Sequence, residues 1–265
     1  MQQSCYREIQ VKPLSPVIGA EIRGVDIGRA TDEALSEIRS AIFENLVIFI
    51  PEQDITPAQQ VTFARFFGDV PPVPDSMFRV HPDSAYVSVL ENDEQRPPTV
   101  NNWHSDYSFA PMPDFLSVLL TRVIPAVGGD TNWVNMYAAF EALNDQIKQR
   151  LRNLSAVHDY MKLYERPSKR HLWEGERYQQ MEMARQQHPP VSHPVVRTIP
   201  ETRRQALFVN ESFTRAIEGL PAKESDALLV DLFDHVRTPE YQLRYQWQPD
   251  TLAVWDNRVT THYAV

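Results

Sequence analysis

The residues most able to do chemistry in this sequence are histidines and carboxylates whose spacing suits a metal ion. Eight histidines occur among 265 residues, and one of them begins the tripeptide His104-Ser105-Asp106. Residues i and i+2 of a strand point to the same face, so this tripeptide can present an imidazole and a carboxylate to one ion. Two histidines and one carboxylate on one side of a metal are typical of non-haem Fe(II) oxygenases, in which the remaining positions receive substrate and oxygen.

The His-x-Asp pattern alone is weak, because it also occurs at His81-Pro82-Asp83 and because a chain with this many histidines and aspartates gives roughly half a match by chance. The stretch RVHPDS is polar, and its Pro82 and Asp83 favour a surface turn. The segment NNWHSDYSF, in contrast, is aromatic and predicts a half-buried strand over 103–109. A buried Asp106 is costly unless it is paired or binds a metal, and both interpretations remain open at this point.

The C-terminal segment TLAVWDNRVTTH supplies a possible third ligand. An apolar strand runs into Trp255-Asp256-Asn257-Arg258, and His262 follows. Taken alone, His262 is compatible with an ordinary structural histidine. Together with the His104 segment it completes a set of two histidines and one carboxylate, which is much more specific than either segment.

These candidate ligands need a framework, and the apolar pattern predicts one. Strands are expected at 46–50, 85–90, 103–109, 115–124 and in TNWVNM, VVRTI, QALFV, YQLRYQW and TLAVW, after short extended segments in 9–28. Helices are expected from the Thr31 cap to about Asn45, from Thr56-Pro57 to near Gly68, at 137–143, at 145–151 and at about 222–236.

The order of these elements predicts the fold class. Strands dominate the middle and the end, and helices sit at the start and in insertions, which is not a repeating βαβ pattern. The expected fold is mainly β with flanking helices: a double-stranded β-helix, or jelly roll, formed by 1–265 as a single domain. The polar segment 165–190 is expected to be a partly helical insertion, at about 160–190, that could act as a lid.

Composition excludes several partners. The net charge is −9, so a general nucleic-acid surface is not expected. No apolar stretch is long enough to span a bilayer, and the N-terminal residues have no apolar signal core. Cys5 is the single cysteine, which fits a reducing compartment. We therefore expect a cytoplasmic protein that binds neither membrane nor nucleic acid.

Several segments together resemble one known family. VKPLSPVIGAEIRGVDI, NNWHSD, GGDT, HPVVRT, LFVNESF and WDNRVTTH occur in this order along nearly the whole chain. They resemble the taurine dioxygenase (TauD/TfdA-like) family of Fe(II)/2-oxoglutarate-dependent dioxygenases. The resemblance implies Fe(II), 2-oxoglutarate and O2, hydroxylation of a small anionic organic acid with release of succinate and CO2, and a homo-oligomer, either a dimer or a tetramer.

The resemblance also assigns roles to individual residues. His104, Asp106 and His262 match the metal ligands. Thr131 in GGDT matches a hydroxyl that contacts the carboxylate of 2-oxoglutarate, and Trp255 matches an aromatic residue close to the iron. Each could instead have an ordinary structural role, and so could the residues expected to line the substrate pocket, which are Val73, Val100, Tyr107, Tyr164 and Phe213.

The sequence departs from the family pattern in two places. An arginine that holds the far carboxylate of 2-oxoglutarate is expected beyond the last histidine, but the sequence stops at Val265; Arg258 is too close to His262 to replace it and is expected to form a structural ion pair. We expect the chain to be truncated there. In addition, Val73 stands where taurine enzymes hold the sulfonate with a histidine, and Thr99 and Val100 replace an Asp-Asn pair.

The second departure bears on the substrate. Taurine's charged groups would be left unpaired in a more apolar pocket, at a cost of a few kcal/mol. We therefore expect taurine to be a poor substrate and an alkyl sulfonate, a sulfate ester or an aryloxyalkanoate to be better. Two alternatives remain: a zinc-dependent hydrolase, for which the sequence suggests no general base, and a non-catalytic 2-oxoglutarate-binding protein.

Overall fold

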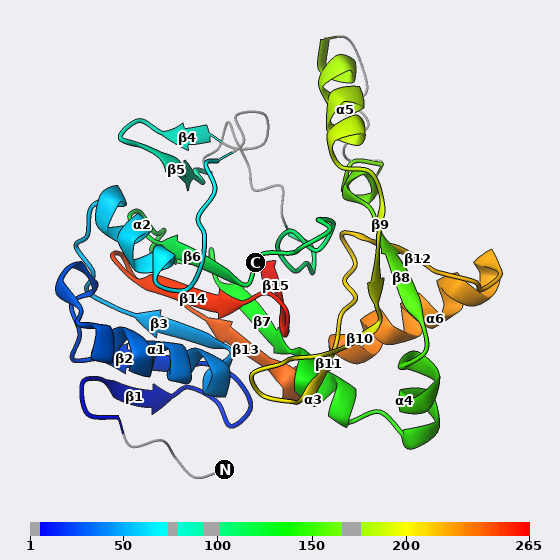
Figure 1. Cartoon of the computed structure of the whole chain (residues 1–265), viewed down its shortest axis with the longest axis horizontal. Helices are drawn as coiled ribbons and strands as arrows, with labels where there is room; N and C mark the ends of the chain where they lie inside the picture. Colours follow the sequence, from blue (N-terminus) through cyan, green and yellow to red (C-terminus); the bar gives the residue numbers. More distant parts are fainter. Residues whose placement is uncertain (1–5, 74–78, 93–100, 166–175) are drawn as a thin grey trace.

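The computed structural model describes residues 6–73, 79–92, 101–165 and 176–265. Strands dominate the described chain, and helices lie at its periphery (Figure 1). The strands are β1 (Gln10–Pro13), β2 (Ala20–Arg23), β3 (Val47–Ile50), β4 (Arg79–His81), β5 (Ser84–Val89), β6 (Leu116–Leu120), β7 (Thr131–Asn135), β8 (Ser155–His158), β9 (Val191–Pro194), β10 (Val196–Thr198), β11 (Gln205–Leu207), β12 (Thr214–Ile217), β13 (Gln242–Tyr245), β14 (Leu252–Asp256) and β15 (Thr260–Ala264). The α-helices are α1 (Asp32–Asn45), α2 (Pro57–Arg65), α3 (Met136–Glu141), α4 (Asp145–Leu151), α5 (Glu176–Gln187) and α6 (Ala222–Val236).

The largest sheet has five strands in the order β1-β2-β3-β14-β6. Its central strands, β3 and β14, are buried along their whole length, which explains why both read as continuous apolar runs. One face packs against α1, whose Ile38 and Ile42 are fully buried with Ile48 and Val254 of the sheet. This packing fixes the position of β14, which places Trp255 beside His262.

A second sheet, β13-β7-β15, lies against the other face of the first. The Phe49 ring of β3 stacks on the Tyr245 ring of β13 with centroids 3.6 Å apart, and it meets Trp133 of β7 edge-on at 5.3 Å. Buried aromatic rings therefore hold the two sheets together, and aromatic pairs of this kind contribute about 0.5–1.5 kcal/mol each beyond their buried area. Strand β15 ends near the middle of the molecule (Figure 1).

A separate group of elements lies beside these two sheets. It contains the three-stranded sheet β12-β8-β9, the hairpin β10-β11 and helix α6. Helix α5 projects away from the rest of the molecule (Figure 1). The predicted insertion is thus helical over Glu176–Gln187, whereas residues 166–175 lie outside the described part of the chain.

Most predicted elements are confirmed. Thr31 caps α1 by accepting a hydrogen bond from the Ala34 amide at 3.2 Å, and Thr56 forms a capping box with Gln59 before Pro57 at the start of α2. The predicted surface turn at His81-Pro82-Asp83 is also present, with the Asp83 side chain 80% exposed.

One predicted strand is wrong. Residues 103–109 do not form an extended strand: only His104 pairs as an isolated bridge, and a turn begins at Asp106. Tyr107 has a φ of 52°, in the left-handed region that a strand does not use. In the described part of the chain, no helix is both long and apolar enough to cross a membrane.

Candidate metal centre

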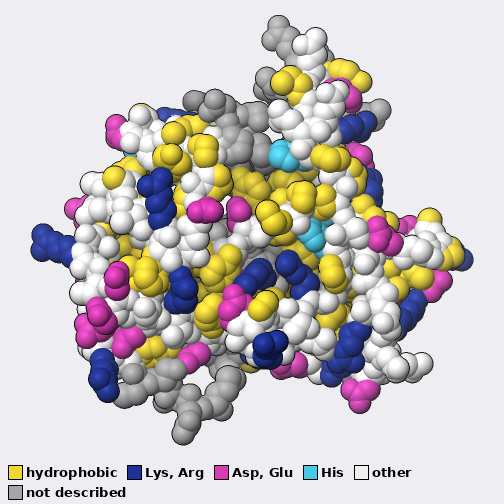
Figure 2. All heavy atoms as spheres, in the orientation of Figure 1, with side chains coloured by type: hydrophobic (Ala, Val, Ile, Leu, Met, Phe, Trp, Pro, Cys, Tyr) yellow, Lys and Arg dark blue, Asp and Glu magenta, His cyan; other side chains and the backbone are white. Residues whose placement is uncertain are grey.

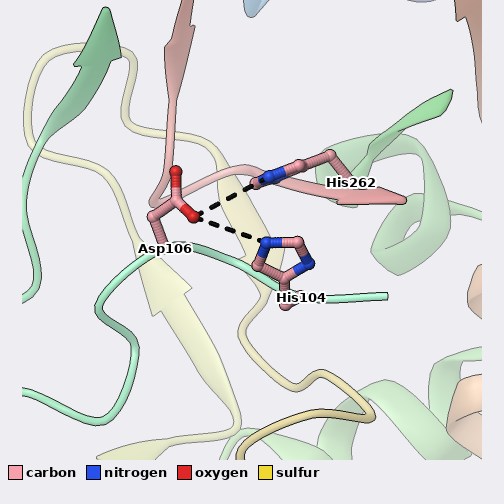
Figure 3. A group of neighbouring side chains, drawn as sticks. All are labelled: His104, Asp106 and His262. Carbon is pink, nitrogen blue, oxygen red and sulfur yellow. Dashed lines mark ion pairs between the residues drawn. The ribbon is translucent and has the colours of Figure 1, made fainter. Parts of the chain in front are cut away.

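His104, Asp106 and His262 come together in the folded chain. Their candidate ligand atoms all lie within 4.8 Å of one another. One oxygen of Asp106 lies 3.5 Å from Nε2 of His104 and 3.7 Å from Nε2 of His262, and the imidazole rings are 4.0 Å apart at their centroids. Figure 3 shows the carboxylate directed toward both rings. This arrangement is compact enough for three side chains to bind one ion.

Backbone pairing places the two histidines side by side. The amide of His104 donates to the carbonyl of His262 at 3.0 Å, and the amide of His262 donates to the carbonyl of His104 at 2.7 Å. His262 also pairs across the sheet with Trp133 of β7. The hydroxyl of Ser105 donates to the carbonyl of Thr260 at 2.7 Å, which ties the loop to β15 a second time.

Asp106 is delivered by a turn and not by strand alternation. The left-handed backbone of Tyr107 reverses the chain immediately after Asp106, and the amide of Ala110 donates to the carbonyl of Tyr107 at 2.8 Å. A tyrosine in this conformation is uncommon and costs about 1–3 kcal/mol, and such strain is concentrated at functional sites. The structure therefore brings the predicted pair together, but through a turn and not through the i, i+2 geometry of a strand.

The hydrogen bonds of the histidines show which ring atoms can bind a metal. Nδ1 of His104 lies 2.8 Å from the carbonyl oxygen of Asn102, so this nitrogen carries the proton and Nε2 keeps its lone pair for a metal. Nδ1 of His262 is buried and has no partner within the described residues. Two imidazoles and a carboxylate, with Nε2 atoms directed to one point, are a donor set that fits Fe(II).

A chain of hydrogen bonds holds the Asp106 carboxylate. The hydroxyl of Ser117 on β6 donates to Oδ2 at 2.6 Å, and Nδ2 of Asn257 donates to that hydroxyl at 2.9 Å. Burial opposes the charge, but His262, His104 and the Ser117 hydrogen bond outweigh it, so the pKa of Asp106 is lowered. The Trp255 indole also favours the charged form, although it does not meet the geometry of a hydrogen bond.

His262 is held in its neutral form. Burial lowers its pKa to about 3, with a further lowering from His104 that Asp106 partly offsets. Metal ligands must be deprotonated, so an ionised Asp106 and a neutral His262 at neutral pH are both in the form that binds a metal.

Thr131 and Trp255, to which the family resemblance assigns roles near the cosubstrate and the iron, both lie near His262. Thr131 begins β7 two residues before Trp133, the partner of His262 in β15, so its side chain is on the same face of the sheet. The ring of Trp255 meets the His262 ring edge-on at 5.2 Å. Both side chains are at least nine-tenths buried.

Three residues predicted to line the substrate pocket belong to one aromatic cluster. Phe213 lies 4.8 Å from Phe109, and Tyr107 lies 5.5 Å from the same ring. Tyr160 packs on Phe109 at 4.7 Å and places its hydroxyl 2.8 Å from that of Tyr164. Apolar side chains gather at the centre of this face of the molecule, at the foot of α5 (Figure 2).

Three other residues were singled out in the sequence: Val73, Val100 and Arg258. Val73 is half-buried and its amide donates to the carbonyl of Ala85 in β5, whereas Val100 lies outside the described residues. Arg258 forms the expected structural ion pairs, with Asp256 at 2.8 Å and Glu201 at 3.0 Å.

Several residues of the site could not be found from the sequence. No motif marks Ser117, Phe109 or Tyr160, and Asn257 lies in the segment WDNRVTTH without a predicted role of its own. Several of their contacts join separate elements: Ser117 reaches Asp106 across 11 residues, Asn257 reaches Ser117 across 140, and Phe109 packs on Phe213. Such pairings depend on the register of the sheets, which local sequence patterns do not specify.

Comparison with known proteins gives consistent matches along the whole chain. Residues 10–265 match the model of the taurine catabolism dioxygenase TauD, TfdA family. The chain is 32% identical to an alkylsulfatase of Acinetobacter baylyi, covering 99% of this chain and 82% of that protein. It is 33% identical to an alpha-ketoglutarate-dependent sulfate ester dioxygenase of Pseudomonas putida (97% and 84% covered), and 29% identical to an (S)-phenoxypropionate/alpha-ketoglutarate-dioxygenase of Sphingobium herbicidovorans (96% and 88%).

Solved structures also match this chain over most of its length. A taurine dioxygenase from Burkholderia xenovorans superposes with a TM-score of 0.75 at 32% identity, covering 97% of this chain and 83% of that one. The structure of AAD-2 in complex with Mn(II) and N-oxalylglycine superposes with a TM-score of 0.78 at 29% identity, covering 97% and 91%.

Proposed function

The chain belongs to the taurine catabolism dioxygenase TauD, TfdA family, and we propose that it is an Fe(II)- and 2-oxoglutarate-dependent dioxygenase whose metal is held by His104, Asp106 and His262. The observation that carries the assignment of ligands is the convergence of two Nε2 atoms on one carboxylate oxygen. The proton on Nδ1 of His104 is already engaged by a carbonyl, as in other sites where a histidine binds a metal.

The chemistry comes from the bound partners, and the protein positions them. Bound iron, 2-oxoglutarate and O2 together supply the oxidant: one oxygen atom enters succinate, released with CO2, and the other replaces a substrate C–H by C–OH. Ser117 and Asn257 fix the carboxylate of Asp106. Thr131 would donate a hydrogen bond from its hydroxyl to a carboxylate of bound 2-oxoglutarate, and Trp255 shields the side of His262 from water.

At the level of the whole chain, the proposal includes a single jelly-roll domain. Support comes from the two packed sheets and from the likeness to solved dioxygenases at 29–32% identity. The family resemblance also supports a homo-oligomer, either a dimer or a tetramer. The lone Cys5 supports a cytoplasmic location, and the net charge of −9 argues against a nucleic acid as partner.

For the substrate, we propose an organic acid with an apolar body: a sulfate ester, an alkyl sulfonate or an aryloxyalkanoate. Support comes from the relatives that act on sulfate esters and phenoxypropionate and from the aromatic cluster that Tyr107, Tyr164 and Phe213 share with Phe109. Rings of this kind bury an alkyl or aryl group well, and Thr99 and Val100, which replace the Asp-Asn pair of the taurine enzymes, offer no carboxylate to the ammonium group of taurine.

A substrate comparison tests this proposal. Iron-loaded protein with 2-oxoglutarate is given hexyl sulfate, hexanesulfonate, phenoxyacetate or taurine, and succinate formation is measured. We expect kcat/KM for at least one apolar acid to exceed that for taurine by tenfold or more, because an unpaired buried charge costs at least about 1–3 kcal/mol. Equal or faster turnover of taurine would contradict the proposed substrate class.

An anaerobic titration tests the reaction class itself. Fe(II) and then 2-oxoglutarate are added to the protein, and the weak visible charge-transfer band of the chelated cosubstrate is recorded. We expect the band in the wild type and none in His104→Ala. Oxygen uptake that depends on 2-oxoglutarate distinguishes the oxygenase from a non-catalytic binding protein, and hydrolysis supported by Zn(II) without oxygen would instead favour a zinc hydrolase.

A further inference from the structure

The indole of Trp247 donates a hydrogen bond to the hydroxyl of Thr131. The two atoms, Nε1 and Oγ1, are 3.0 Å apart. Both side chains are buried, at 7% and 9% exposure, so water does not compete for this bond. The contact joins Trp247, two residues after the end of β13, to the first residue of β7, 116 positions away.

This hydrogen bond has a direction that constrains the hydroxyl. An indole N–H can only donate, whereas a threonine hydroxyl has one proton and two lone pairs. Trp247 therefore occupies a lone pair of Thr131 and leaves its proton directed elsewhere. Within the described part of the chain, no oxygen or nitrogen accepts that proton. A buried donor without an acceptor costs about 1–3 kcal/mol, so a bound acceptor would be stabilised at this position.

The hydroxyl is on the metal side of its sheet. Thr131 and Trp133 are two residues apart on β7, and Trp133 pairs with His262 on β15. Residues i and i+2 of a strand share a face, as do cross-strand partners. The proton that Trp247 leaves free is therefore available on the face that also presents His262.

The indole itself is held firmly. Its ring lies 5.9 Å from Phe49, 5.8 Å from Trp133 and 5.4 Å from Tyr245, each in an edge-on arrangement. Phe49 and Trp133 are fully buried. The N–H cannot turn away from Thr131 without disturbing the aromatic packing between the two sheets.

We propose that Trp247 is a positioning residue for the cosubstrate: its N–H fixes the orientation of the Thr131 hydroxyl and thereby aims the threonine proton at a carboxylate of 2-oxoglutarate. The inference rests on the proposed function, in which Thr131 contacts that carboxylate. Donation from the indole also polarises the hydroxyl, and a polarised hydroxyl is a stronger donor.

The test is a double-mutant cycle read by binding and not by turnover. Trp247→Phe keeps most of the ring volume and removes the N–H, and Thr131→Val removes the hydroxyl. The Kd of 2-oxoglutarate is measured by anaerobic titration of Fe(II)-loaded protein. We expect Trp247→Phe to weaken binding about threefold to tenfold, the range that one hydrogen bond spans. Thr131→Val weakens it at least as much, and the double variant equals Thr131→Val.

Two matched variants control for the loss of a nearby polar group and for the threonine hydroxyl. Tyr245→Phe removes a hydroxyl from a ring that packs on Trp247, keeps that ring and the Trp247–Thr131 bond, and leaves the Kd unchanged. Thr131→Ser keeps a hydroxyl and restores most of the affinity. Should Trp247→Phe not fold, the test uses protein with ¹⁵N-labelled indoles: the Trp247 resonance moves in Thr131→Val and stays in Thr131→Ser.

Each other outcome overturns the proposal in a recognisable way. If Trp247→Phe binds 2-oxoglutarate with wild-type affinity while Thr131→Val binds it weakly, Thr131 contacts the cosubstrate but Trp247 has no positioning role. Additive losses in the double variant mean that Trp247 acts through packing. If the Trp247 indole resonance does not shift in Thr131→Val, the Trp247–Thr131 hydrogen bond is excluded. If the wild type binds metal but no 2-oxoglutarate, the proposed function fails together with the inference.

Discussion

At the scale of single residues, the centre depends on side chains that do not themselves reach the metal. Asp106 is a quarter exposed, and both of its oxygens are directed: Oδ1 lies between the histidines, and Oδ2 accepts the proton of Ser117. A carboxylate with one oxygen fixed in this way loses little further freedom when a metal binds. Preorganisation of this kind is what residues around a metal site contribute.

The Ser117→Ala substitution tests this support. Removal of the hydroxyl frees Asp106 to rotate and leaves Nδ2 of Asn257 without its acceptor. We expect metal affinity to fall about tenfold to a hundredfold, as is usual when the partner of a metal ligand is lost. Titration of the metal-free protein with Mn(II), followed by electron paramagnetic resonance, measures the change.

Ser40→Ala is a suitable control for Ser117→Ala. Its hydroxyl donates to the carbonyl of Ser36 on the exposed side of α1, far from the centre in sequence. The control should bind Mn(II) as the wild type does. If the two alanine variants bind equally well, Ser117 has no part in holding Asp106 for the metal.

At the scale of elements, the centre is assembled where two sheets meet. Strand β15 provides His262, and the bridge to His104 extends the pairing of β15 by a single residue before the chain turns. Strand β14 provides Trp255 and is held between β3 and β6 in full register. The large sheet in turn is covered by α1, so the helix contributes to the site only through the stability of the sheet beneath it.

The Thr31→Ala substitution tests this layer. Thr31 satisfies the Ala34 amide at the start of α1, and loss of such a cap costs about 1 kcal/mol. We expect the free energy of unfolding in urea to fall by about this amount. Metal affinity should stay unchanged, because the cap lies at the far side of the sheet from the ligands.

A second threonine provides the comparison. The hydroxyl of Thr62 donates to the carbonyl of Ala58 on the exposed face of α2, where it caps no free amide. Thr62→Ala should change stability by less than about 0.5 kcal/mol. A loss at Thr62 as large as that at Thr31 would show that capping is not the cause.

At the scale of the whole molecule, buried histidines couple stability to pH. His158 on β8 is fully buried and stacks on Phe208 at 5.3 Å. Burial, with the nearby His193, lowers its pKa from 6.5 to about 3. Between these values the unfolded chain binds a proton that the folded protein does not, so stability must fall as pH is lowered. The contribution of neutral His158 is complete above about pH 6.5.

The His158→Gln substitution removes this titration. In urea unfolding at pH 7.5, 6.5, 5.5 and 4.5, we expect the wild type to lose stability faster than the variant, by about 1.4 kcal/mol per pH unit below 6.5. The free energy of unfolding of the variant therefore rises relative to that of the wild type as the pH is lowered. Parallel curves for the two proteins over this range would mean that His158 is protonated equally in both states.

Local sequence patterns predicted much of this protein. The caps at Thr31 and Thr56, the apolar runs of β3 and β14 and the surface turn at His81-Pro82-Asp83 all depend on neighbours within a few residues. The three candidate metal ligands were predicted from the spacing of His104 and Asp106, two residues apart, from the position of His262 after an apolar strand and from the family resemblance, and the structure brings them together. The order of motifs along the chain was enough to indicate the family.

Only the tertiary structure decided how these residues meet. The turn at Tyr107 replaced the predicted strand over 103–109, because long-range contacts such as Ser105 with Thr260 stabilise a conformation that local preference disfavours. The hydrogen bonds from Ser117 of β6 to Asp106 and from Trp247 to Thr131 of β7 likewise depend on how separate elements pack together. Local propensity sets each element, but burial and hydrogen bonding between elements set the geometry of the site.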